Sequence, residues 1–553
     1  MKHLATVLLL SLALAAGALA EPIPPGTAYT LSEYRGHAAV ERILERGGVP
    51  FSFDFHPEEA AVAGFLRDRD IAYTIVRFDF GSHPETTFYS FSPEDRQAFF
   101  DLLDAESWTR EPDTPEGWQV LVPPSASFRY HIASIDGKTV ISEDPDALRA
   151  ALDLYPSLPA RIPAEGGIAV QIRPDCLQGS AFDPDRVALV RRNVDALSAG
   201  LGLDGDTYAL HAVLAPVPGS DLAGYFRSCG PISPATACVN LPGAVAFYAD
   251  ASDPSLPDAF RDVAAPSFMA GVDRRRAGQP SSIALFPPTD SAALPVPRAL
   301  AFVGLTDIST ARPALLSLFA RHSGIASLVP AAPHRDIPVD TLAVADPVAF
   351  ARHLDTFCGG GGATPCAILA QGLAAGQITL SLAWLPDGIL FAANDAGSDL
   401  LHAAIDAALD GTATPFEETP AFRAAYPGPD GPACAIAHLD LPALLAALPP
   451  QIASFLPAIP DPCSIDCLSY IATAGTLAAR VRAPADLVKA FFGHGRTATK
   501  TLAIPDEPPP RVLPWDDPIP FETTSETITS RDIDAEAVVF WREFLEPPAG
   551  LVH

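Results

Sequence analysis

The sequence predicts an α+β fold made of two related halves, each a mostly antiparallel sheet with helices packed on one face. Two observations predict it. The outline of residues 49–66, VPFSFDFHPEEAAVAGFL, reappears at 245–261, and later landmarks recur in the same order through residue 493. Short strand-like runs are also joined by tight turns or lead directly into helix starts, which is typical of antiparallel sheets combined with helices.

Each predicted helix follows a strand through Asp, Ser or Pro. FYSF leads to Ser92 and Pro93, and TLAVA leads to Asp346 and Pro347. Asp or Ser accepts hydrogen bonds from the first N–H groups of a helix, and Pro at the first helical position has no N–H to leave unbonded. Similar helix starts are expected at His56–Pro57, Asp144–Pro145 and Arg482–Asp486.

Each half also contains one predicted hairpin. FRYHIASI meets KTVIS through Asp136–Gly137, and ITLSLAWL meets ILFAA through Pro386, Asp387 and Gly388. Asp-Gly between two strand-like runs is a strong hairpin signal, because both turn positions favour positive φ.

The correspondence between the halves rests on landmarks that occur in the same order, with extra residues in the second half. The alternative is chance similarity among Ala-rich and Pro-rich segments. The predicted pairs are Pro57 with Pro254, 72–80 with 299–307, Pro93 with Pro347, Asp136 with Asp387, 167–172 with 433–438, and Asp221–Leu222 with Asp486–Leu487.

Changes in composition divide the chain into four parts. Residues 1–20 are predicted to be a signal peptide, 21–232 the first half, 240–503 the second half with its insertion, and 504–553 a proline-rich tail. The tail ends in a short amphipathic segment, 533–545, which is predicted to be helical.

The N-terminus predicts export to an extracytoplasmic location, periplasmic or secreted. Lys2 and His3 precede an apolar run, and Ala18-Leu19-Ala20 then presents small residues at the spacing that signal peptidases cleave. An uncleaved membrane anchor is the alternative, but the run is shorter than the roughly 20 residues a span requires. No other stretch predicts a transmembrane helix.

The eight cysteines agree with an oxidising compartment. Zinc binding is the rival explanation, but no two cysteines show the C-x2-C spacing. The pairs suggested by sequence proximity are Cys229 with Cys238, Cys358 with Cys366, and Cys463 with Cys467, which leaves Cys176 and Cys434, one in each half, as a long-range bridge.

Charge excludes some classes of partner. The chain has 66 acidic and 36 basic residues, a formal net charge of -30, and 48% of its residues are hydrophobic. Such a surface repels phosphate backbones and anionic lipid, so no nucleic-acid partner is expected. The charge also keeps an apolar-rich chain soluble.

No catalytic, cofactor or metal motif is present, and we predict no catalytic, cofactor-binding or metal-binding residues. Gly359–Gly362 lack the Lys-Ser/Thr ending of a phosphate loop and lie between two cysteines. His438 and Asp440 should point to one side of a strand, where a carboxylate could orient an imidazole, but a solvent-facing strand edge explains them as well.

One segment suggests a resemblance. The run Ala345-Asp346-Pro347-Val348-Ala349-Phe350, a strand ending in Asp-Pro-x-x-Phe, loosely resembles a group of duplicated exported bacterial proteins of unknown function. The resemblance implies no activity and no functional residues.

Three hypotheses of function follow. The first is an exported, non-catalytic binding or structural protein with an unknown protein or polymer partner, because the two halves share turn and strand residues but no catalytic constellation. The second is an extracytoplasmic hydrolase with a site in only one half. The third is an assembly or inhibitor protein that acts through its C-terminal tail.

Overall fold

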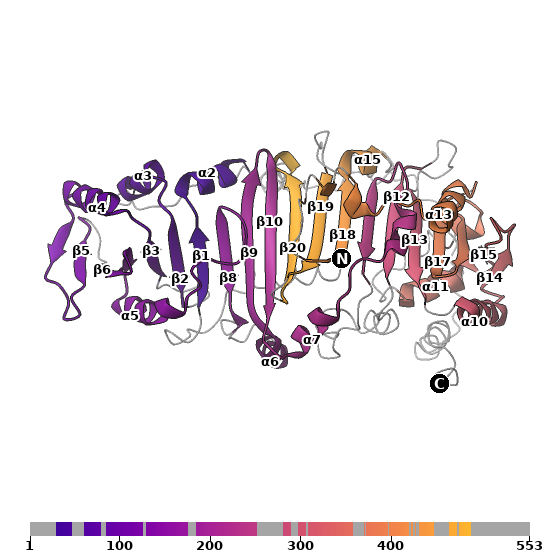
Figure 1. Cartoon of the computed structure of the whole chain (residues 1–553), viewed down its shortest axis with the longest axis horizontal. Coiled ribbons are helices and arrows are strands. Elements are labelled where there is room, and N and C mark those ends of the chain that lie inside the picture. Colours follow the sequence, from indigo (N-terminus) through magenta and orange to yellow (C-terminus); the bar gives the residue numbers. More distant parts are fainter. Residues whose placement is uncertain are drawn as a thin grey trace, which may run out of the picture.

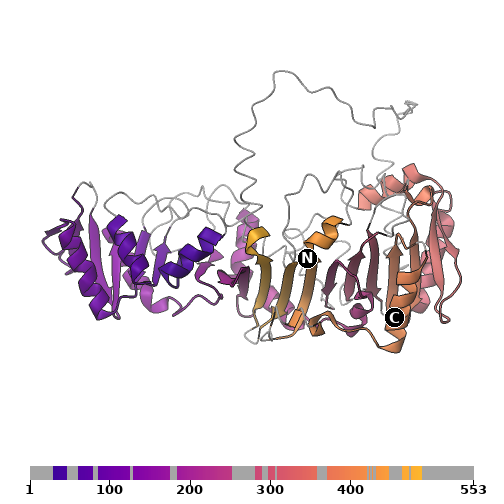
Figure 2. The same cartoon turned by 90° about the horizontal axis from the view of Figure 1, so that it is seen from above.

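The computed structural model describes residues 29–46, 60–78, 85–124, 129–174, 184–251, 280–288, 297–305, 308–357, 370, 372–395, 397–419, 422–423, 426, 431–446, 464–472 and 475–487. The described strands form one sheet that runs along the length of the molecule (Figure 1). Figure 2, seen from above, shows the same strands side by side.

The strands fall into two groups of ten. The first group is β1 (Thr30–Tyr34), β2 (Tyr73–Arg77), β3 (Glu85–Tyr89), β4 (Thr109–Glu111), β5 (Gln119–Val122), β6 (Tyr130–Ile135), β7 (Lys138–Ser142), β8 (Ile168–Ile172), β9 (Val194–Asp204) and β10 (Thr207–Pro216). The second group is β11 (Ala246–Asp250), β12 (Ser281–Phe286), β13 (Arg298–Gly304), β14 (Ala326–Pro330), β15 (Val339–Val344), β16 (Leu380–Leu385), β17 (Gly388–Ala393), β18 (Ala433–Asp440), β19 (Ser464–Ile471) and β20 (Leu477–Pro484).

Every pair of neighbouring strands in the described part of the chain is antiparallel. The order across the sheet is β4-β5-β6-β7-β3-β2-β1-β8-β9-β10-β20-β19-β18-β11-β12-β13-β17-β16-β15-β14. Counted outward from the β10–β20 pair, the two groups place their strands in the same order. The predicted α+β class with mainly antiparallel pairing is confirmed, but the two groups form one continuous sheet.

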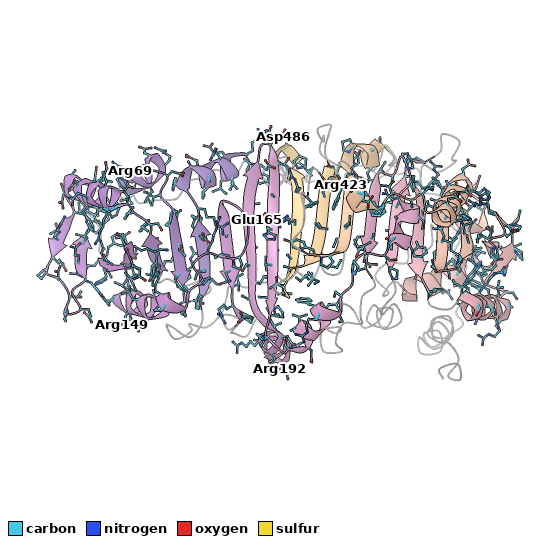
Figure 3. The ribbon with its side chains drawn as sticks, in the orientation of Figure 1. Arg69, Arg149, Glu165, Arg192, Arg423 and Asp486 are labelled. Carbon is cyan, nitrogen blue, oxygen red and sulfur yellow. The ribbon has the colours of Figure 1, made fainter. Side chains whose placement is uncertain are left out.

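Strands far apart in sequence join the groups at the centre. Residues Thr207–Leu214 of β10 pair with Leu477–Pro484 of β20. Glu165, labelled beside these strands in Figure 3, forms an ion pair with Arg480 of β20 at 2.6 Å. Its segment can lie on β9 because Gly200 has no side chain, since a Cβ there would be 2.0 Å from the Glu165 carbonyl oxygen.

The helices connect the strands and cover the sheet. They are α2 (His37–Arg46), α3 (Ala60–Asp68), α4 (Pro93–Ala105), α5 (Pro145–Leu154), α6 (Pro184–Asn193), α7 (Asp221–Ser228), α10 (Ile308–Arg321), α11 (Pro347–Phe357), α13 (Asp399–Asp410) and α15 (Leu441–Ala446), with the 3-10 turns η1 (Tyr155–Ser157), η3 (Pro234–Val239) and η4 (Phe416–Glu418).

The helices pack on both faces of the sheet, and the prediction of one covered face is wrong. In the first group, Val140 packs with Leu148 of α5, whereas Ile132 packs with Leu66 of α3 on the opposite face. In the second group, α13 and α10 cover opposite faces in the same way. The physical reason is that strands such as KTVIS and GILFAA carry apolar side chains at consecutive positions, so both faces need a cover.

The predicted helix starts are confirmed where they are described. Ser92 accepts a hydrogen bond from the N–H of Asp95 at the start of α4, and Asp144 accepts from residues 146 and 147 in α5. Asp346 does the same for the first turn of α11. His56–Pro57 lies outside the described residues.

Both hairpins form, but their turns differ. Asp136 and Gly137 have φ of 46° and 78°, as the Asp-Gly turn predicts. The second turn consists of Pro386 and Asp387, neither of which is among the described residues with positive φ. Gly388 instead begins β17, where a Cβ would be 2.4 Å from the Val303 carbonyl oxygen. Gly388 is therefore required for close strand approach, and the predicted positive-φ role for it is wrong.

The predicted correspondences agree only partly with the strand order. The two hairpins, 167–172 with 433–438, and Asp221 with Asp486 fall at equivalent places. Residues 72–80 and 299–307 do not, because they contain β2 and β13, whereas the counterpart of β2 is β12. Pro93 and Pro347 also differ, since α4 and α11 start after non-equivalent strands. The repeated Pro-containing helix starts produced these misalignments.

Candidate functional site

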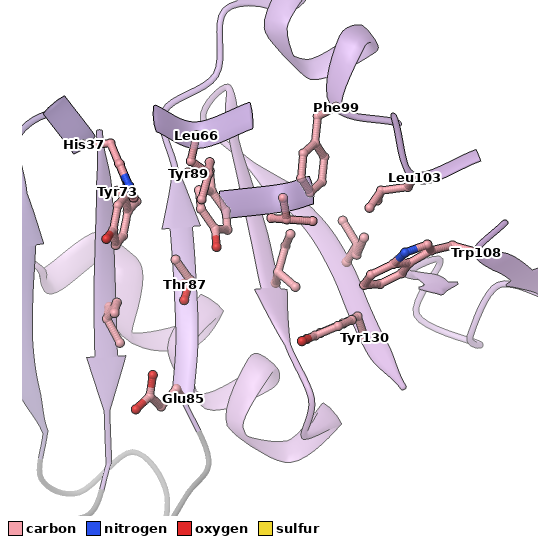
Figure 4. Close-up of a pocket in the computed structure, with 14 residues that line it drawn as sticks. His37, Leu66, Tyr73, Glu85, Thr87, Tyr89, Phe99, Leu103, Trp108 and Tyr130 are labelled. Atoms are coloured by element: carbon pink, nitrogen blue, oxygen red, sulfur yellow. The ribbon is translucent and has the colours of Figure 1, made fainter. Parts of the chain in front are cut away.

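A cleft lies in the first group, between one face of the sheet and helices α2, α3 and α4 (Figure 4). Its volume is about 220 Å³. Eleven of its lining side chains are apolar or aromatic and three are His37, Glu85 and Thr87. The full lining consists of His37, Val62, Leu66, Tyr73, Ile75, Glu85, Thr87, Tyr89, Phe99, Leu103, Trp108, Tyr130, Ile132 and Ile141.

The floor is one row of side chains from four neighbouring strands. Ile75 lies opposite Thr87, Thr87 lies opposite Ile141, and Ile141 lies opposite Ile132. Directly opposite residues of antiparallel strands point to the same face. The sheet therefore presents three isoleucines and one threonine as a continuous, largely apolar surface.

Tyr73 and Tyr89 line one end of the floor, and Tyr34 stacks against Tyr73 next to the cleft. Tyr34, Tyr73 and Tyr89 occupy directly opposite positions on β1, β2 and β3. The ring centroids of Tyr34 and Tyr73 are 4.7 Å apart, and those of Tyr73 and Tyr89 are 5.8 Å apart. Burial raises the pKa of Tyr73 well above its usual range, and Tyr34 and Tyr89 add to the effect. The Tyr73 hydroxyl is therefore uncharged at any physiological pH.

Helices and the start of β4 provide the roof. Leu66 of α3 and Phe99 of α4 are both nearly inaccessible to solvent. Trp108 stacks on Tyr130 with ring centroids 5.4 Å apart. The indole N–H of Trp108 is buried and makes no hydrogen bond within the described part of the chain. The roof is thus as apolar as the floor.

Two ionisable groups lie at opposite ends of the cleft (Figure 4). Burial lowers the pKa of His37, which favours a neutral imidazole. Glu85 forms an ion pair with Arg77 at 2.6 Å, and both side chains remain partly exposed. The cleft therefore has one neutral polar end and one acidic end.

The size and apolar lining of this cleft allow it to accommodate a ligand. Thr87 supplies the hydroxyl on the floor of the cleft. Within the described ranges, no group of three or more His, Cys, Asp or Glu side chains is placed to hold a metal ion. A closed and empty cavity of this volume would cost on the order of 5 kcal/mol of stability, which an apolar ligand would partly recover.

A second cavity, beside η3 and η4, is much smaller. Its volume is about 30 Å³, and Thr236, Phe247 and Phe416 are among its lining residues. A space of this size holds about one water molecule. It offers no room for a ligand.

The sequence suggested that Asp440 could orient the imidazole of His438, but in the structure each of these residues has a different hydrogen-bond partner. The Nδ1 atom of His438 lies 2.7 Å from Asp466 on the neighbouring strand, directly opposite in register. Asp440 instead accepts a hydrogen bond from the N–H of Ala443 at the start of α15. In the described structure, no hydroxyl or thiol is hydrogen-bonded to the His438 ring. The pattern within one strand missed Asp466 because cross-strand neighbours depend on register.

The described cysteines lie in two different apolar clusters. Cys238 is in the core of the second group, whereas Cys229, at the end of α7, packs in the cluster that contains Cys434. Cys238 and Cys467 are free thiols, so the bond expected between Cys229 and Cys238 is not formed in this structure. Burial raises the pKa of both free thiols to about 12.

The remaining expectations fall outside the described residues. The pairing scheme as a whole stays a prediction for the oxidised protein. The unplaced residues are Cys176, Cys358, Cys366, Cys463, Gly359–Gly362, the signal segment 1–20 and the tail 504–553.

No sequence pattern pointed directly to the cleft. Its floor combines residues from β2, β3, β7 and β6, and the β3–β7 neighbourhood skips three strands in the chain. The one pattern visible in the sequence is that Tyr73 begins a strand and Tyr89 ends the next one. Only the register shows that the two rings lie side by side.

Comparisons with known proteins identify no family. None of the helices in the described ranges is long and apolar enough to cross a membrane. No protein-family model and no curated protein matches the chain. Crystal form IV of TP0453 is 15% identical with a TM-score of 0.22, covering 36% of this chain and 81% of that one. Crystal form III is 12% identical with a TM-score of 0.21, covering 36% and 82%. The chain thus has weak structural neighbours, and the resemblance of Ala345–Phe350 to bacterial proteins of unknown function stays loose.

Proposed function

We propose that this protein is an exported, non-catalytic binding protein that holds a small, mainly apolar molecule in the cleft of its first strand group. The observation that carries the proposal is the preformed apolar space of about 220 Å³ between sheet and helices. An apolar cavity of roughly 150 Å³ suffices to bind benzene. The cleft therefore has room for an aromatic ring or a short segment of hydrocarbon chain.

The lining supports binding in two further ways. Three isoleucines on rigid neighbouring strands hold the floor in place, so little order has to be gained on binding. The rings of Tyr89, Phe99 and Trp108 add flat apolar area with few rotatable bonds. Both features favour affinity without a catalytic group.

Two broader inferences accompany this function. We infer that the two strand groups arose by duplication, which the repeated strand order and the matching hairpins support. We also infer export with cleavage after Ala20, supported by the apolar run and small residues of the N-terminus. N-terminal sequencing of protein recovered from outside the cytoplasm checks the second inference, and a mature chain that begins at Met1 would contradict it.

The test is titration with N-phenyl-1-naphthylamine, a neutral apolar fluorophore that brightens in dry sites. We expect saturable binding to the purified full chain, with affinity falling from wild type to Ile141→Phe to Ile141→Trp, because each larger ring occupies more of the floor. The larger ring should weaken binding at least tenfold.

The matched control is Ile283→Trp, on β12 of the second group. Ile283 is 42% exposed and lies on a central strand outside the cleft, so this variant should bind the fluorophore as the wild type does. Thermal melts confirm that each variant is folded. Equal loss in folded Ile141→Trp and Ile283→Trp, or no saturable binding by the wild type, would refute the proposed site.

A further inference from the structure

The charges around the cleft indicate which class of ligand it accepts. We propose that the cleft selects apolar molecules whose polar end is a cation, and that Glu85 is the residue that determines this selectivity. This inference rests on the proposed function and specifies its ligand class.

The wall of the cleft presents no positive charge to an anionic ligand. Among the lining residues, His37 is the only one that could become cationic, and burial lowers its pKa. Arg77 lies nearby but is held by Glu85 at 2.6 Å. A carboxylate end group would therefore lose its hydration without gaining a basic partner.

Glu85 supplies the opposite charge at the partly exposed end of the floor. Figure 4 shows it beyond Thr87, on the same strand and away from His37. Its side chain is 32% exposed and that of Arg77 is 47% exposed, so the guanidinium can turn into water when a ligand cation takes its place. A ligand can thus bury its apolar part on the floor and keep its charged end beside Glu85.

The aromatic walls and the whole-protein charge act in the same direction. The faces of tyrosine and tryptophan rings attract cations, and Tyr73, Tyr89, Tyr130 and Trp108 all line the space. The chain carries a formal net charge of -30, which raises the local concentration of cations and lowers that of anions. Size and apolarity admit the ligand, and charge then selects it.

The experiment displaces bound N-phenyl-1-naphthylamine with three ligands that share an eight-carbon chain: octyltrimethylammonium, octanol and octanoate. At pH 7.5 and low ionic strength we expect the ammonium compound to compete best and octanoate worst, with at least a fivefold difference between them. Raising the salt concentration should reduce that difference, because screening weakens the charge interaction.

Two variants assign the effect to the residue. In Glu85→Gln the preference for ammonium over carboxylate should fall to less than twofold, while octanol competes as before. In Arg77→Gln, which removes the guanidinium paired with Glu85, the preference should increase. The matched control is Glu111→Gln, because Glu111 forms a similar ion pair with Arg129 at 2.9 Å but does not line the cleft.

The outcomes separate this inference from the proposed function. If the fluorophore binds but the three competitors are equivalent, or octanoate is the best, the charge selectivity is wrong and the apolar site stands. A folded Glu85→Gln protein that keeps the full preference would also overturn the role of Glu85. If the fluorophore itself does not bind, the proposed function fails first.

Discussion

The hairpins β6–β7 and β16–β17 stand at equivalent places in the strand order but carry side chains of different size. Both have two-residue turns, so register aligns Ser134 with Trp384. By the same register, Thr139 corresponds to Ile389 and Ile141 to Phe391. Where the second group places large side chains, the first group places smaller ones, and the cleft lies over the first group.

The difference shows that the same strand order is compatible with a covered sheet face and with an open one. In the second group, Trp384 packs with Leu315 of α10, Leu382 and Ile389. Its indole N–H donates to Asp340 at 2.7 Å, whereas the indole N–H of Trp108, beside the cleft, has no hydrogen-bond partner within the described residues. The sheet face of the second group is thus covered by the protein's own side chains, whereas the first group leaves an apolar cleft.

The largest expected effect on stability comes from removing the acceptor of Trp384 in the second group. Asp340 is fully buried and holds both Trp384 and, at 3.4 Å, Arg312. Asp340→Ala should lower the free energy of unfolding by about 1–3 kcal/mol, because it leaves the buried indole N–H of Trp384 without its acceptor and the partly exposed Arg312 guanidinium without its partner. Urea denaturation measures the change.

The control for this prediction is Asp153→Ala, at an exposed position of α5. It should change stability by less than about 0.5 kcal/mol. A cost for Asp340→Ala no larger than that of the control would show that the buried cluster does not stabilise the second group.

Much of the local structure was predictable from the sequence, because short-range chemistry determines it. Ser92 and Asp144 cap helices as expected, and Asp136–Gly137 forms its turn. The arrangement of strands was not predictable in the same way. The pairing of β10 with β20 joins residues more than two hundred positions apart, and no local pattern specifies such a partner.

The candidate site was still less accessible to sequence reasoning. Its character depends on which side chains face each other across β2, β3, β7 and β6, and a shift of one residue would move all of them to the other face. Ile141 and Val140 are equally apolar in sequence, yet only Ile141 lines the cleft. The paired His438 and Asp466 were missed for the same reason.

A second, smaller effect concerns how the stability of the first group depends on pH. Burial lowers the pKa of His37 below its usual 6.5, so the unfolded chain binds a proton that the folded chain resists. Stability should therefore fall as the pH drops below about 6.5 and level off below the folded pKa. His131, whose pKa is also lowered by burial, contributes in the same direction.

His37→Gln isolates the contribution of the cleft histidine. Between pH 7.5 and pH 5.5 the wild type should lose more unfolding free energy than the variant does, because only the wild type carries His37. A difference that is the same at both pH values would show that His37 does not resist protonation.

The smallest expected effect makes one position of the first group resemble the second. Thr139 is fully buried, and its hydroxyl makes no hydrogen bond within the described part of the chain. Thr139→Val keeps the shape and removes the unsatisfied group, so it should raise the free energy of unfolding by about 1 kcal/mol. Fluorophore binding should not change, because Thr139 does not line the cleft. A destabilised variant would mean that the hydroxyl is satisfied in solution.

The central strand pair also has a consequence for how the chain is made. During synthesis β10 emerges long before β20, and until residues 477–484 arrive, the backbone groups of Thr207–Leu214 on that side have no strand to pair with. A chain that folds from its N-terminus would therefore present an unpaired strand edge until β20 is available. Such an edge is a template for pairing with other chains, so the chain is most prone to aggregate before β10 and β20 have paired.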